Sequence, residues 1–489
     1  ISMYAKCGEF AKARELFGKF SVQNVVSWNA LISAYVEHGL GNEALNCYRT
    51  MQDEGLVPNA VTFICTLKAC GAIGDIEKGE EIHAEIDNQG FLLKNIVVGT
   101  SVVDMYARCG MLAKAREVLH SLPERNVVSW TALIGGYAQH GIGNEALKCF
   151  QQMKDEGILP NAATFSCVLK ACASTRSVKK GEEVHAEVRK LGLLKNNLVL
   201  GTALLDMYAK CGDLDKAQAL FDGLPQQSVV SWNALITGYV QHGFADEAIN
   251  SFNRMRNEGH SPNVVTYASI LKACGILRST EMGEEIHAEL IKQKLLVKDI
   301  VLGNALVDMY AKCGNLDKAR VVFDELPIRN TVSWNALISG YVQYGLDKEA
   351  LNCFNKMRND GLAPDDITFT STLKACIGIG SGRKGKELHV EIIKQGLLED
   401  NTVLGTALVD MYAKFGAVLE AQKVFDELSV RDTICWNALI AGYAQYGHGG
   451  KALNCFSSML DECLSPDETT YACILKVCSN IGSIEKGEE

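Results

Sequence analysis

The sequence predicts an all-α protein, an α-solenoid of stacked helical hairpins, and three observations lead to this prediction. The five tryptophans recur every 102 residues, and five prolines and five methionines keep the same spacing. Within each period, apolar residues recur at helical spacing. No linker or low-complexity stretch interrupts the pattern, so we expect one continuous array over residues 1–489. The recurring positions are Trp28, Trp130, Trp232, Trp334 and Trp436, then Pro58, Pro160, Pro262, Pro364 and Pro466, and Met3, Met105, Met207, Met309 and Met411.

The first hairpin of each period is predicted over residues 25–59. Its first helix carries apolar residues at i, i+3, i+4 and i+7, which form one face. A glycine turn at 39–41 leads into a second helix with its own apolar face, and Gly55 and Pro58 end that helix. The expected faces are Trp28, Leu31, Ile32 and Tyr35, then Ala44, Cys47, Tyr48 and Met51.

Two further hairpins complete the period. The second, residues 60–95, turns near Gly74, and the third, residues 96–126, breaks at Gly110. The three lengths are 35, 36 and 31 residues, which together make the 102-residue period. The expected buried positions are Phe63, Leu67 and Cys70 in the second hairpin, and Val102, Met105, Tyr106, Cys109, Leu112, Ala115, Leu119 and Leu122 in the third.

Thirteen complete hairpins follow from this division. Four full periods occupy 25–126, 127–228, 229–330 and 331–432, and a first-type hairpin follows at 433–467. Residues 1–24 match the end of a third-type hairpin, and residues 468–489 match the start of a second-type hairpin. Because the array begins and ends inside a repeat, we expect the chain to be a fragment of a longer protein.

Composition and charge narrow the class of protein. The 489 residues are 47% hydrophobic and 22% charged, which is ordinary for a folded chain and excludes wholesale disorder. No apolar run reaches the roughly 18 residues that a membrane span needs, so no membrane partner is expected. The net charge of −10 argues against indiscriminate nucleic-acid binding but is compatible with a local basic groove.

The eighteen cysteines do not predict a disulfide framework or a metal site. No C-x-x-C motif occurs, and a chain of this size does not need stapling. Most of the cysteines recur in register, which favours small buried helix residues in a reducing compartment. The two recurring sets are Cys7, Cys109, Cys211 and Cys313, and Cys70, Cys172, Cys274, Cys376 and Cys478.

Four recurring phrases resemble a known family. They are Val-Val-Ser-Trp-Asn-Ala-Leu-Ile (25–32), Leu-Lys-Ala-Cys (67–70), Gly-Glu-Glu-Ile-His-Ala (79–84) and Asp-Met-Tyr-Ala-Arg-Cys-Gly (104–110). With these hairpin lengths, the whole chain resembles a plant-type pentatricopeptide repeat (PPR) protein of the PLS class, whose hairpins are named P, L and S. The resemblance implies a right-handed superhelix of helix-turn-helix repeats that binds single-stranded RNA, one base per hairpin.

A tetratricopeptide array, which is a protein-binding scaffold, is the main alternative. Its usual repeat length equals the mean hairpin length of 34 residues, and Trp28, Leu31 and Tyr35 match its W-x-x-L-G-x-x-Y pattern, with Ile32 in place of glycine. Two features argue against it. Tryptophan occurs in only one hairpin of three, and the hairpin length varies between 31 and 36 residues.

The resemblance implies that the fifth and last residues of each hairpin recognise the base. In the P hairpins these pairs are Asn29 with Asn59, Thr131 with Asn161, Asn233 with Asn263, Asn335 with Asp365, and Asn437 with Asp467. In the S hairpins they are Thr100 with Asn126, Thr202 with Ser228, Asn304 with Asn330, and Thr406 with Asp432. The second residue would wedge the base between hairpins, and these residues are Val26, Val97, Val128, Val199, Val230, Val301, Val332, Val403 and Ile434.

These residue types fit the chemistry of base recognition. Ionised Asp only accepts hydrogen bonds, which favours uracil and guanine, whereas Asn also donates, which suits cytosine and adenine. The family pairings agree, because Thr/Asn resembles an adenine reader, Thr/Asp guanine, Asn/Asp uracil, and Asn/Asn cytosine over uracil. For the fifth residues, such as Asn29 and Thr100, the alternative is that small polar residues near the helix start are N-caps. The L hairpins are expected to be spacers, with Ile64, Ser166, Ala268, Thr370 and Ala472 at the fifth position.

Recurring cations are expected to contact phosphates from the same face. A lysine lies four residues after the fifth position of each L hairpin, and a cation lies eight residues after it in each S hairpin. The alternative is a solvated charged face. The L set is Lys68, Lys170, Lys272, Lys374 and Lys476, and the S set is Arg108, Lys210, Lys312 and Lys414, with Lys6 in the partial hairpin.

No enzymatic activity, cofactor, metal or small-molecule substrate is expected of this chain. The H-x-E half of a zinc-deaminase signature recurs at His83, His185, His287 and His389, but the P-C-x-x-C half is absent. We interpret these histidines as packing residues that join hairpins. A deaminase-like DYW segment, which PLS proteins often carry, would lie outside the fragment.

These observations lead to one expected function. We expect a specificity factor for organellar C-to-U RNA editing, in the mitochondrion or chloroplast, with a deaminase or editing cofactor supplied in trans. The alternative within the family is a role in organellar RNA splicing, stabilisation or processing. With the N-terminal hairpin at the 5′ side, the pairs predict 5′-Y-n-A-A-n-A-Y-n-Y-U-n-G-U-3′, where Y is a pyrimidine and n an L position.

Overall fold

The structure is a computed structural model that describes residues 3–4, 7–18, 24–194, 197–297, 299–398 and 401–481. Within these ranges all regular elements are helices, and no strand is present. The expected all-α fold is therefore confirmed. Lys6 and parts of the two partial hairpins, 1–24 and 468–489, lie outside the described residues.

Each predicted hairpin contributes a first and a second helix. The first helices are α3 (Val25–Glu37), α5 (Ala60–Ile73), α8 (Ile96–Arg108), α10 (Val127–Gln139), α12 (Ala162–Ser174), α14 (Leu198–Cys211), α16 (Val229–Gln241), α18 (Val264–Leu277), α20 (Ile300–Lys312), α22 (Thr331–Gln343), α24 (Asp366–Gly378), α26 (Thr402–Lys414), α28 (Thr433–Gln445) and α30 (Glu468–Ile481).

The second helices alternate with them along the chain. They are α2 (Phe10–Gly18), α4 (Gly41–Asp53), α6 (Ile76–Asn88), α9 (Leu112–Ser121), α11 (Gly143–Asp155), α13 (Val178–Lys190), α15 (Leu214–Asp222), α17 (Ala245–Asn257), α19 (Thr280–Lys292), α21 (Leu316–Glu325), α23 (Asp347–Asn359), α25 (Gly382–Lys394), α27 (Val418–Glu427) and α29 (Gly449–Asp461). One short helix that the sequence does not predict, α7 (Phe91–Lys94), precedes α8.

Local sequence signals explain where these helices begin and end. Asn59 caps α5 by accepting from the backbone N–H of Thr62, and the Thr62 hydroxyl accepts in turn from the backbone N–H of Asn59, which forms a capping box. The same helix ends at Gly74, whose φ of 75° is a left-handed conformation that glycine adopts without strain. The turn predicted near Gly74 is therefore confirmed.

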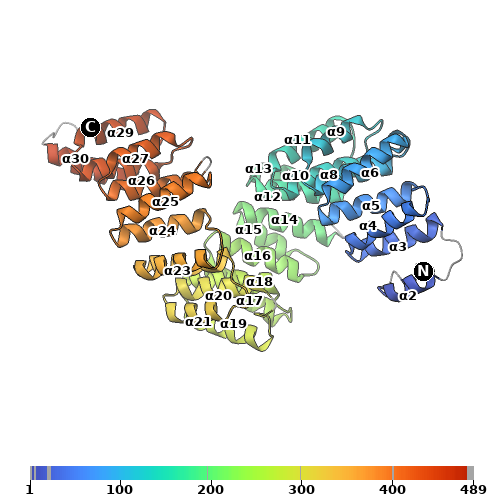
Figure 1. Cartoon of the computed structure of the whole chain (residues 1–489), viewed down its shortest axis with the longest axis horizontal. Helices are drawn as coiled ribbons and strands as arrows, with labels where there is room; N and C mark the ends of the chain where they lie inside the picture. Colours follow the sequence, from blue (N-terminus) through green and yellow to red (C-terminus); the bar gives the residue numbers. More distant parts are fainter. Residues whose placement is uncertain are drawn as a thin grey trace. The chain divides into compact units, whose positions relative to one another are not determined.

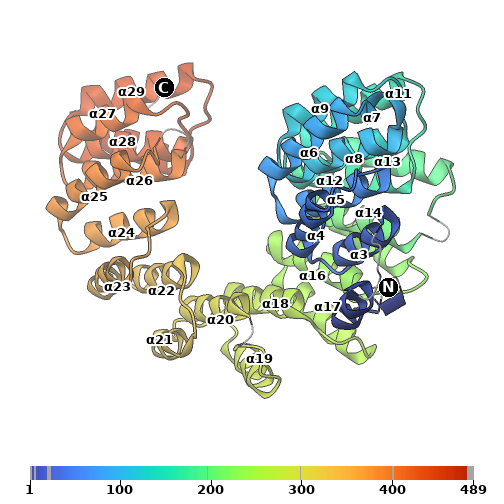
Figure 2. The same ribbon diagram turned by 45° about the vertical axis from the view of Figure 1, so that its right-hand side comes forward.

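The helices group into two compact units, Ile1–Phe244 with Asn257–Ser261, and Ala245–Arg256 with Pro262–Glu489. In the first unit, the first helices from α3 to α16 pack on one another in chain order, and each second helix packs on its own and the following first helix (Figure 1). The second unit repeats this arrangement from α18 to α30, and Figure 2 shows α24, α26 and α28 following one another there. Within each unit, the first helices therefore form one continuous layer.

The core lies between the two helices of each hairpin and between neighbouring hairpins. The predicted faces of α3 and α4 are buried, from Trp28 to Met51, and Trp130 and Trp232 are fully enclosed. Burying side chains of this size removes most of their apolar surface from water and contributes about 2–3 kcal/mol each. None of the described helices is long and apolar enough to span a membrane.

The cysteine prediction is correct for one set and wrong for the other. Cys70, Cys172, Cys274 and their equivalents Cys376 and Cys478 are buried. Cys109, Cys211 and Cys313 are only half-buried, and Cys7 is exposed. The reason is their place at the C-terminal end of the first S helix, where the chain leaves the core. There the Cys109 thiol contacts the backbone carbonyl of Cys70 at 3.8 Å.

Candidate functional site

The fifth residue of several first helices contacts the last residue of the same hairpin. Asn29 donates from Nδ2 to Asn59 Oδ1 at 3.0 Å, although 30 residues separate them. Asn335 donates to both carboxylate oxygens of Asp365, at 2.8 and 3.0 Å. The same bond joins Asn437 to Asp467 at 2.9 and 3.0 Å and Asn304 to Asn330 at 3.2 Å. The spacing of 30 or 26 residues therefore places each of these pairs at one point.

The N-cap interpretation of the fifth residues is wrong, and the caps are instead the last residues of the preceding hairpins. Asn29 lies at the fifth position of α3, inside the helix, where no capping bond is needed. The last residue instead precedes the next first helix and caps it. These caps are Asn59, Asn126, Asn161, Ser228, Asn263, Asn330, Asp365 and Asp432, and Asp467 accepts from the backbone N–H of Thr470 in the same way.

Capping determines which atom of the last residue remains available. Oδ1 of Asp365 accepts from the Thr368 backbone, the Thr368 hydroxyl and Asn335, whereas Oδ2 accepts only from Asn335. In Asn59, Oδ1 accepts the hydrogen bonds from all the donors around the cap. The amide nitrogen Nδ2 therefore lies on the opposite side of the amide group. The atom that remains is an acceptor in the Asp copies and a donor in the Asn copies.

Threonine at the fifth position makes different contacts. The Thr131 hydroxyl contacts the Thr164 hydroxyl at 2.7 Å, and Thr164 in turn donates to Asn161, so threonine meets the cap indirectly. In the S hairpins, Thr202 donates to the Leu198 carbonyl of its own helix at 2.8 Å. The Thr100 hydroxyl and Asn304 Oδ1 are buried without a hydrogen-bond partner in the structure. A buried polar atom without a hydrogen-bond partner is costly, so these two atoms differ from the paired ones.

Three equivalent grooves run between the first helices of an S hairpin and the P hairpin that follows it. The groove between α8 and α10 has a volume of about 590 Å³ and is lined by Thr100, Thr131 and Asn161. The groove between α20 and α22 has about 500 Å³ and includes Asn304 and Asn335. The third, between α26 and α28, has about 480 Å³ and includes Thr406, Asn437, Asp432 and Asp467. Members of the predicted S and P base-recognition pairs therefore line one groove, which we call the S–P groove.

The predicted wedge residues are strongly exposed apolar side chains. Val26 is 73% exposed, and the others are between 52% and 72% exposed, so more than half of the surface of each residue is open to solvent. They are Val97, Val128, Val199, Val230, Val301, Val332, Val403 and Ile434, and six of these line the S–P grooves. The sequence interpretation missed that this row continues into the L hairpins at Val61, Val265 and Ile367. Their shared second position in the hairpin was the signal that could have found them.

The predicted cations fall into two classes. The L lysines Lys68, Lys170, Lys272 and Lys374 are exposed, line the S–P grooves, and have no ion-pair partner among the described residues. The S cations are paired with an aspartate four residues earlier, which the sequence interpretation missed despite the readable i, i+4 spacing. These pairs are Arg108 with Asp104, Lys210 with Asp206, Lys312 with Asp308, and Lys414 with Asp410, at 2.7–2.9 Å.

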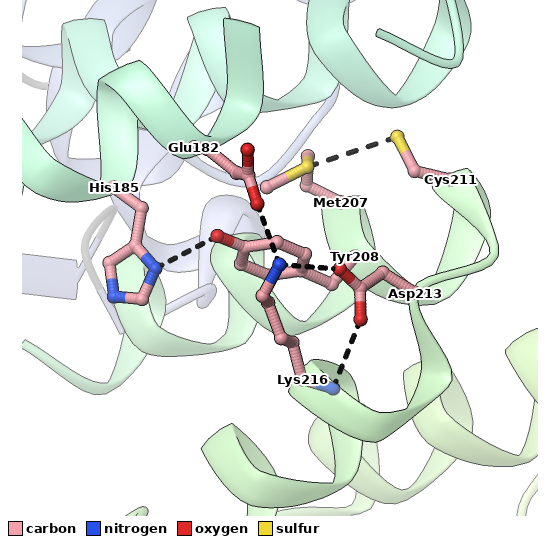
Figure 3. Close-up of polar contacts among 7 residues, drawn as sticks. All are labelled: Glu182, His185, Met207, Tyr208, Cys211, Asp213 and Lys216. Carbon is pink, nitrogen blue, oxygen red and sulfur yellow. Dashed lines mark hydrogen bonds and ion pairs between the residues drawn. The ribbon is translucent and has the colours of Figure 1, made fainter. Parts of the chain in front are cut away.

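The recurring H-x-E motif joins each L hairpin to both neighbours. His185 contacts the Tyr208 hydroxyl in the following S hairpin at 3.0 Å (Figure 3). Glu187 forms an ion pair with Lys154 in the preceding P hairpin, at 2.9 Å. The other three copies follow the same plan, with His83 to Tyr106, His287 to Tyr310 and His389 to Tyr412. Among the described residues no group of His, Cys, Asp or Glu could hold a metal ion.

An ion pair next to the histidine also joins the L hairpin to the following S hairpin. Lys216 in α15 contacts Glu182 in α13 at 2.6 Å and Asp213 at 2.8 Å, as Figure 3 shows. The equivalent contacts are Lys114 with Glu80 and Lys318 with Glu284. In the fourth copy the charges are exchanged, because Lys386 lies in the L hairpin and Glu420 in the S hairpin, 3.7 Å apart. The attraction is kept although both residue types change, which supports a structural role for these second helices.

Two family models match the chain in the predicted register. The model of the PPR repeat family matches residues 23–72, 125–174, 227–275, 329–378 and 431–480, each covering a P hairpin and the following first L helix. The model of the PPR repeat matches residues 1–25, 100–127, 202–228, 304–330 and 406–432, in the S hairpins. The chain belongs to the pentatricopeptide repeat family. The match favours PPR repeats over tetratricopeptide repeats, and none of the matched segments is a catalytic domain.

Relatives in Arabidopsis thaliana match over nearly the whole chain. A chloroplastic pentatricopeptide repeat-containing protein is 35% identical over 98% of this chain and 77% of its own length. A mitochondrial one is 33% identical over the whole chain and 70% of its own length. Another mitochondrial relative, 35% identical, is covered over only 47% of its length. The chain thus spans between about half and three-quarters of such relatives.

Solved PPR structures share the fold. The maize pentatricopeptide repeat protein PPR10 matches with a TM-score of 0.54 and 19% identity, over 99% of this chain and 81% of that one. PPR10 in complex with an 18-nucleotide psaJ RNA element matches with a TM-score of 0.51. At this identity the likeness concerns the arrangement of helices alone.

Proposed function

We propose that this chain binds single-stranded RNA in a sequence-specific manner, with one hairpin for each base. The observation that carries the proposal is the contact between the fifth and last residues, which repeats in register beside the S–P grooves. Each contact lies next to an exposed apolar side chain at the second position, such as Val332. A flat base can stack on that side chain while its pairing edge faces the polar pair. The PPR10–RNA complex supports the choice of ligand.

The atoms that the caps leave available would decide which base is preferred. Oδ2 of Asp365 is an acceptor and suits the ring N–H of uracil, while Nδ2 of Asn59 is a donor and suits the ring nitrogen of cytosine. Asp467 keeps its acceptor character because the hydrogen bond from the Thr470 backbone lowers the pKa of its carboxyl group. Thr131 and Thr406 are shorter than Asn and leave room for a purine.

Phosphate contacts would come first from the L lysines. The lysines that line the grooves, Lys68, Lys170, Lys272 and Lys374, form no ion pair among the described residues, so a phosphate would not have to displace one. The S cations would have to exchange an aspartate for a phosphate, and such exposed i, i+4 pairs contribute only about 0.3–0.5 kcal/mol. The L hairpins otherwise act as spacers, because Ile64 and Ala268 offer no side-chain hydrogen bond to a base.

The hairpin lengths support a more specific role in RNA metabolism. The alternation of 35, 36 and 31 residues is that of the PLS class, so the proposed role is recognition of an organellar transcript for C-to-U editing. Relatives named chloroplastic and mitochondrial support an organellar location. A deaminase or editing cofactor would then act in trans or from a segment beyond this chain. A role in organellar RNA splicing, stabilisation or processing is the second candidate.

Selection from a random single-stranded RNA library, followed by sequencing, tests the proposal. The expected result is enrichment of 5′-Y-n-A-A-n-A-Y-n-Y-U-n-G-U-3′, with the adenine under Thr202 and Ser228 the least enriched of its positions. Enrichment of another register would disprove the base assignments but not RNA binding. Preference for duplex RNA, or no binding that weakens with added salt, would disprove the proposed function.

A further inference from the structure

The aspartates paired with the S cations have no role in the base pairing proposed above. Asp104, Asp206, Asp308 and Asp410 lie four residues after the fifth position of each S hairpin, one helical turn further along the same face. Asp104, Asp308 and Asp410 line the three S–P grooves. Their side chains are 30–35% exposed, so their carboxylates are reached by solvent from the groove. We call these four residues the groove aspartates.

Each groove aspartate neutralises the cation that would otherwise attract phosphate to the groove. Arg108 bonds from Nε to Asp104 Oδ2 at 2.8 Å, and the lysines of the other copies reach their aspartates at 2.7–2.9 Å. The L lysines Lys68, Lys272 and Lys374 lie on the first helix that packs against the aspartate's own helix, and they have no such partner among the described residues. Positive charge is therefore uncompensated on the first L helices and compensated on the first S helices, which carry the fifth residues of the S pairs.

This distribution of charge matters because the grooves are roomy. A volume of about 480–590 Å³ between two first helices admits a phosphate as readily as a base. Phosphate contacts carry no sequence information, so a strand held by a phosphate inside the groove would bind whatever its sequence. A carboxylate on the groove wall repels that phosphate but does not repel a neutral base.

We propose that the groove aspartates are specificity-determining residues, which keep phosphates away from the base-recognition pairs in the S–P grooves and so admit only bases there, while the L lysines hold the RNA backbone. This inference rests on the proposed RNA binding. It assigns a discriminating role to residues that contact neither the fifth nor the last residue of a hairpin. Their removal should therefore strengthen binding of unmatched RNA, whereas removal of a base-recognition residue should weaken binding of matched RNA.

The test compares the wild-type chain with a variant in which all four groove aspartates become asparagine. Two single strands are used, the strand enriched by wild-type selection and a scrambled strand of the same composition, each over a range of salt concentrations. Affinity for the scrambled strand should rise roughly 10- to 100-fold near about 0.1 M salt. The slope of log affinity against log salt concentration should become more negative by up to about 3, because each of the four freed cations adds about 0.7 to it. Affinity for the enriched strand should rise less, so discrimination should fall.

A second variant controls for net charge. Glu81→Gln, Glu183→Gln, Asp324→Asn and Glu387→Gln remove four acids that pair within second helices, away from the grooves. This variant should discriminate like the wild type, as should Asp→Glu at the four groove positions. Equal gains in the control, or unchanged discrimination in the asparagine variant, would overturn the inference alone. A wild-type chain that binds neither strand would overturn the proposed function and the inference with it.

Discussion

A single side chain at the end of each hairpin performs two tasks. Asp365 caps α24 through Oδ1 and presents Oδ2 beside Asn335. The cap fixes the carboxylate in one orientation, so the proposed discrimination between bases would need no further ordering of the side chain. The same reasoning explains why only Asn, Asp and Ser occur at the last positions, since these residues are the strongest N-caps.

Base preference at one hairpin should switch with one residue. Asn335→Thr removes the amide that bonds to Asp365 but keeps a hydroxyl, as the chain already does at Thr131. Preference should move from uracil to guanine, because the acceptor remains and the space grows. Asp365→Asn should move it towards cytosine, since asparagine still caps α24 but presents a donor. Affinities for four RNAs that differ only at that nucleotide should change roughly 5- to 100-fold relative to one another, for a mismatch cost of about 1–3 kcal/mol.

The neighbouring hairpins supply the control for this switch. Nucleotides under other hairpins should keep their preferences, because each hairpin contacts mainly its own base. If Asn335→Thr instead weakens all four RNAs equally, the residue only stabilises the hairpin, and the base assignment at this position is wrong.

One tryptophan lacks an acceptor that its equivalents have. Trp28, Trp130 and Trp436 donate from Nε1 to a glutamate at the end of the second helix, at 3.0–3.2 Å. Trp334 is 2% exposed and its Nε1 has no hydrogen-bond partner among the residues that the structure describes, because the equivalent residue is the shorter Asp360. Asp360→Glu should therefore stabilise the chain by about 1 kcal/mol, measured from the midpoint of denaturant unfolding.

Asp360→Asn is the matched control for this stabilisation. It keeps the short side chain and should give no gain. A midpoint that rises equally in both variants would show that the new hydrogen bond to Trp334 is not the cause, because asparagine is no longer than aspartate.

At the scale of elements, neighbouring first helices approach closely at a glycine. A Cβ added to Gly136 in α10 would lie 2.6 Å from Ala107 Cβ and 3.2 Å from Ala107 Cα in α8. Alanine cannot move aside as a long side chain does, so Gly136→Ala should force the helices apart at the S–P groove. The expected destabilisation is about 1–3 kcal/mol in denaturant unfolding, with weaker RNA binding.

A glycine in open space provides the comparison. Gly450 lies in α29, and a Cβ added there meets no atom within 4 Å. Gly450→Ala should be neutral or slightly stabilising, because alanine is the better helix former. If both variants destabilise the chain alike, the close approach of α8 and α10 is not the cause.

The joints between L and S hairpins should make stability depend on pH. Burial lowers the pKa of His83, His185, His287 and His389 below the ordinary value of 6.5. Around His83, Asp87 and Glu80 oppose this shift and Lys114 adds to it, but burial is the larger cause. Above about pH 6.5 these histidines are neutral in both states and their full contribution is present. As the pH falls below that value the unfolded chain takes up protons first, so this contribution is lost.

Replacing all four histidines by glutamine should reduce this dependence. The drop in denaturant midpoint between about pH 7.5 and about pH 5.5 should be smaller in the variant than in the wild type. Glutamine still reaches the tyrosine hydroxyls, so the joint keeps a polar partner. An equal drop in both proteins would place the pH dependence elsewhere in the chain.

At the scale of the whole chain, the repeat period predicts what is identical in every copy. Hairpin boundaries and the buried faces from Trp28 to Met51 can be predicted, because the same helical spacing of apolar residues occurs in every copy. Contacts across hairpins do not follow, because helical periodicity relates residues three or four apart and not His83 to Tyr106. The free atom of Asn59 could not be predicted either, since it depends on which oxygen the cap uses. The ion pairs between the S cations and their aspartates could have been predicted from their i, i+4 spacing. The short helix α7 could not, because it does not belong to the repeating pattern of first and second helices.

A deletion of one whole period tests whether the array reads RNA one base at a time. Residue 228 and residue 126 both cap the first helix of a P hairpin, so removal of residues 127–228 joins Asn126 to Val229 in an existing geometry. The shortened chain should fold, because each hairpin packs only on its neighbours. Selection should then enrich 5′-Y-n-A-Y-n-Y-U-n-G-U-3′, with three nucleotides lost from the middle and both flanks unchanged. A chain that still enriches the original sequence, or that loses the 3′ part of it, would show that recognition is not assigned hairpin by hairpin.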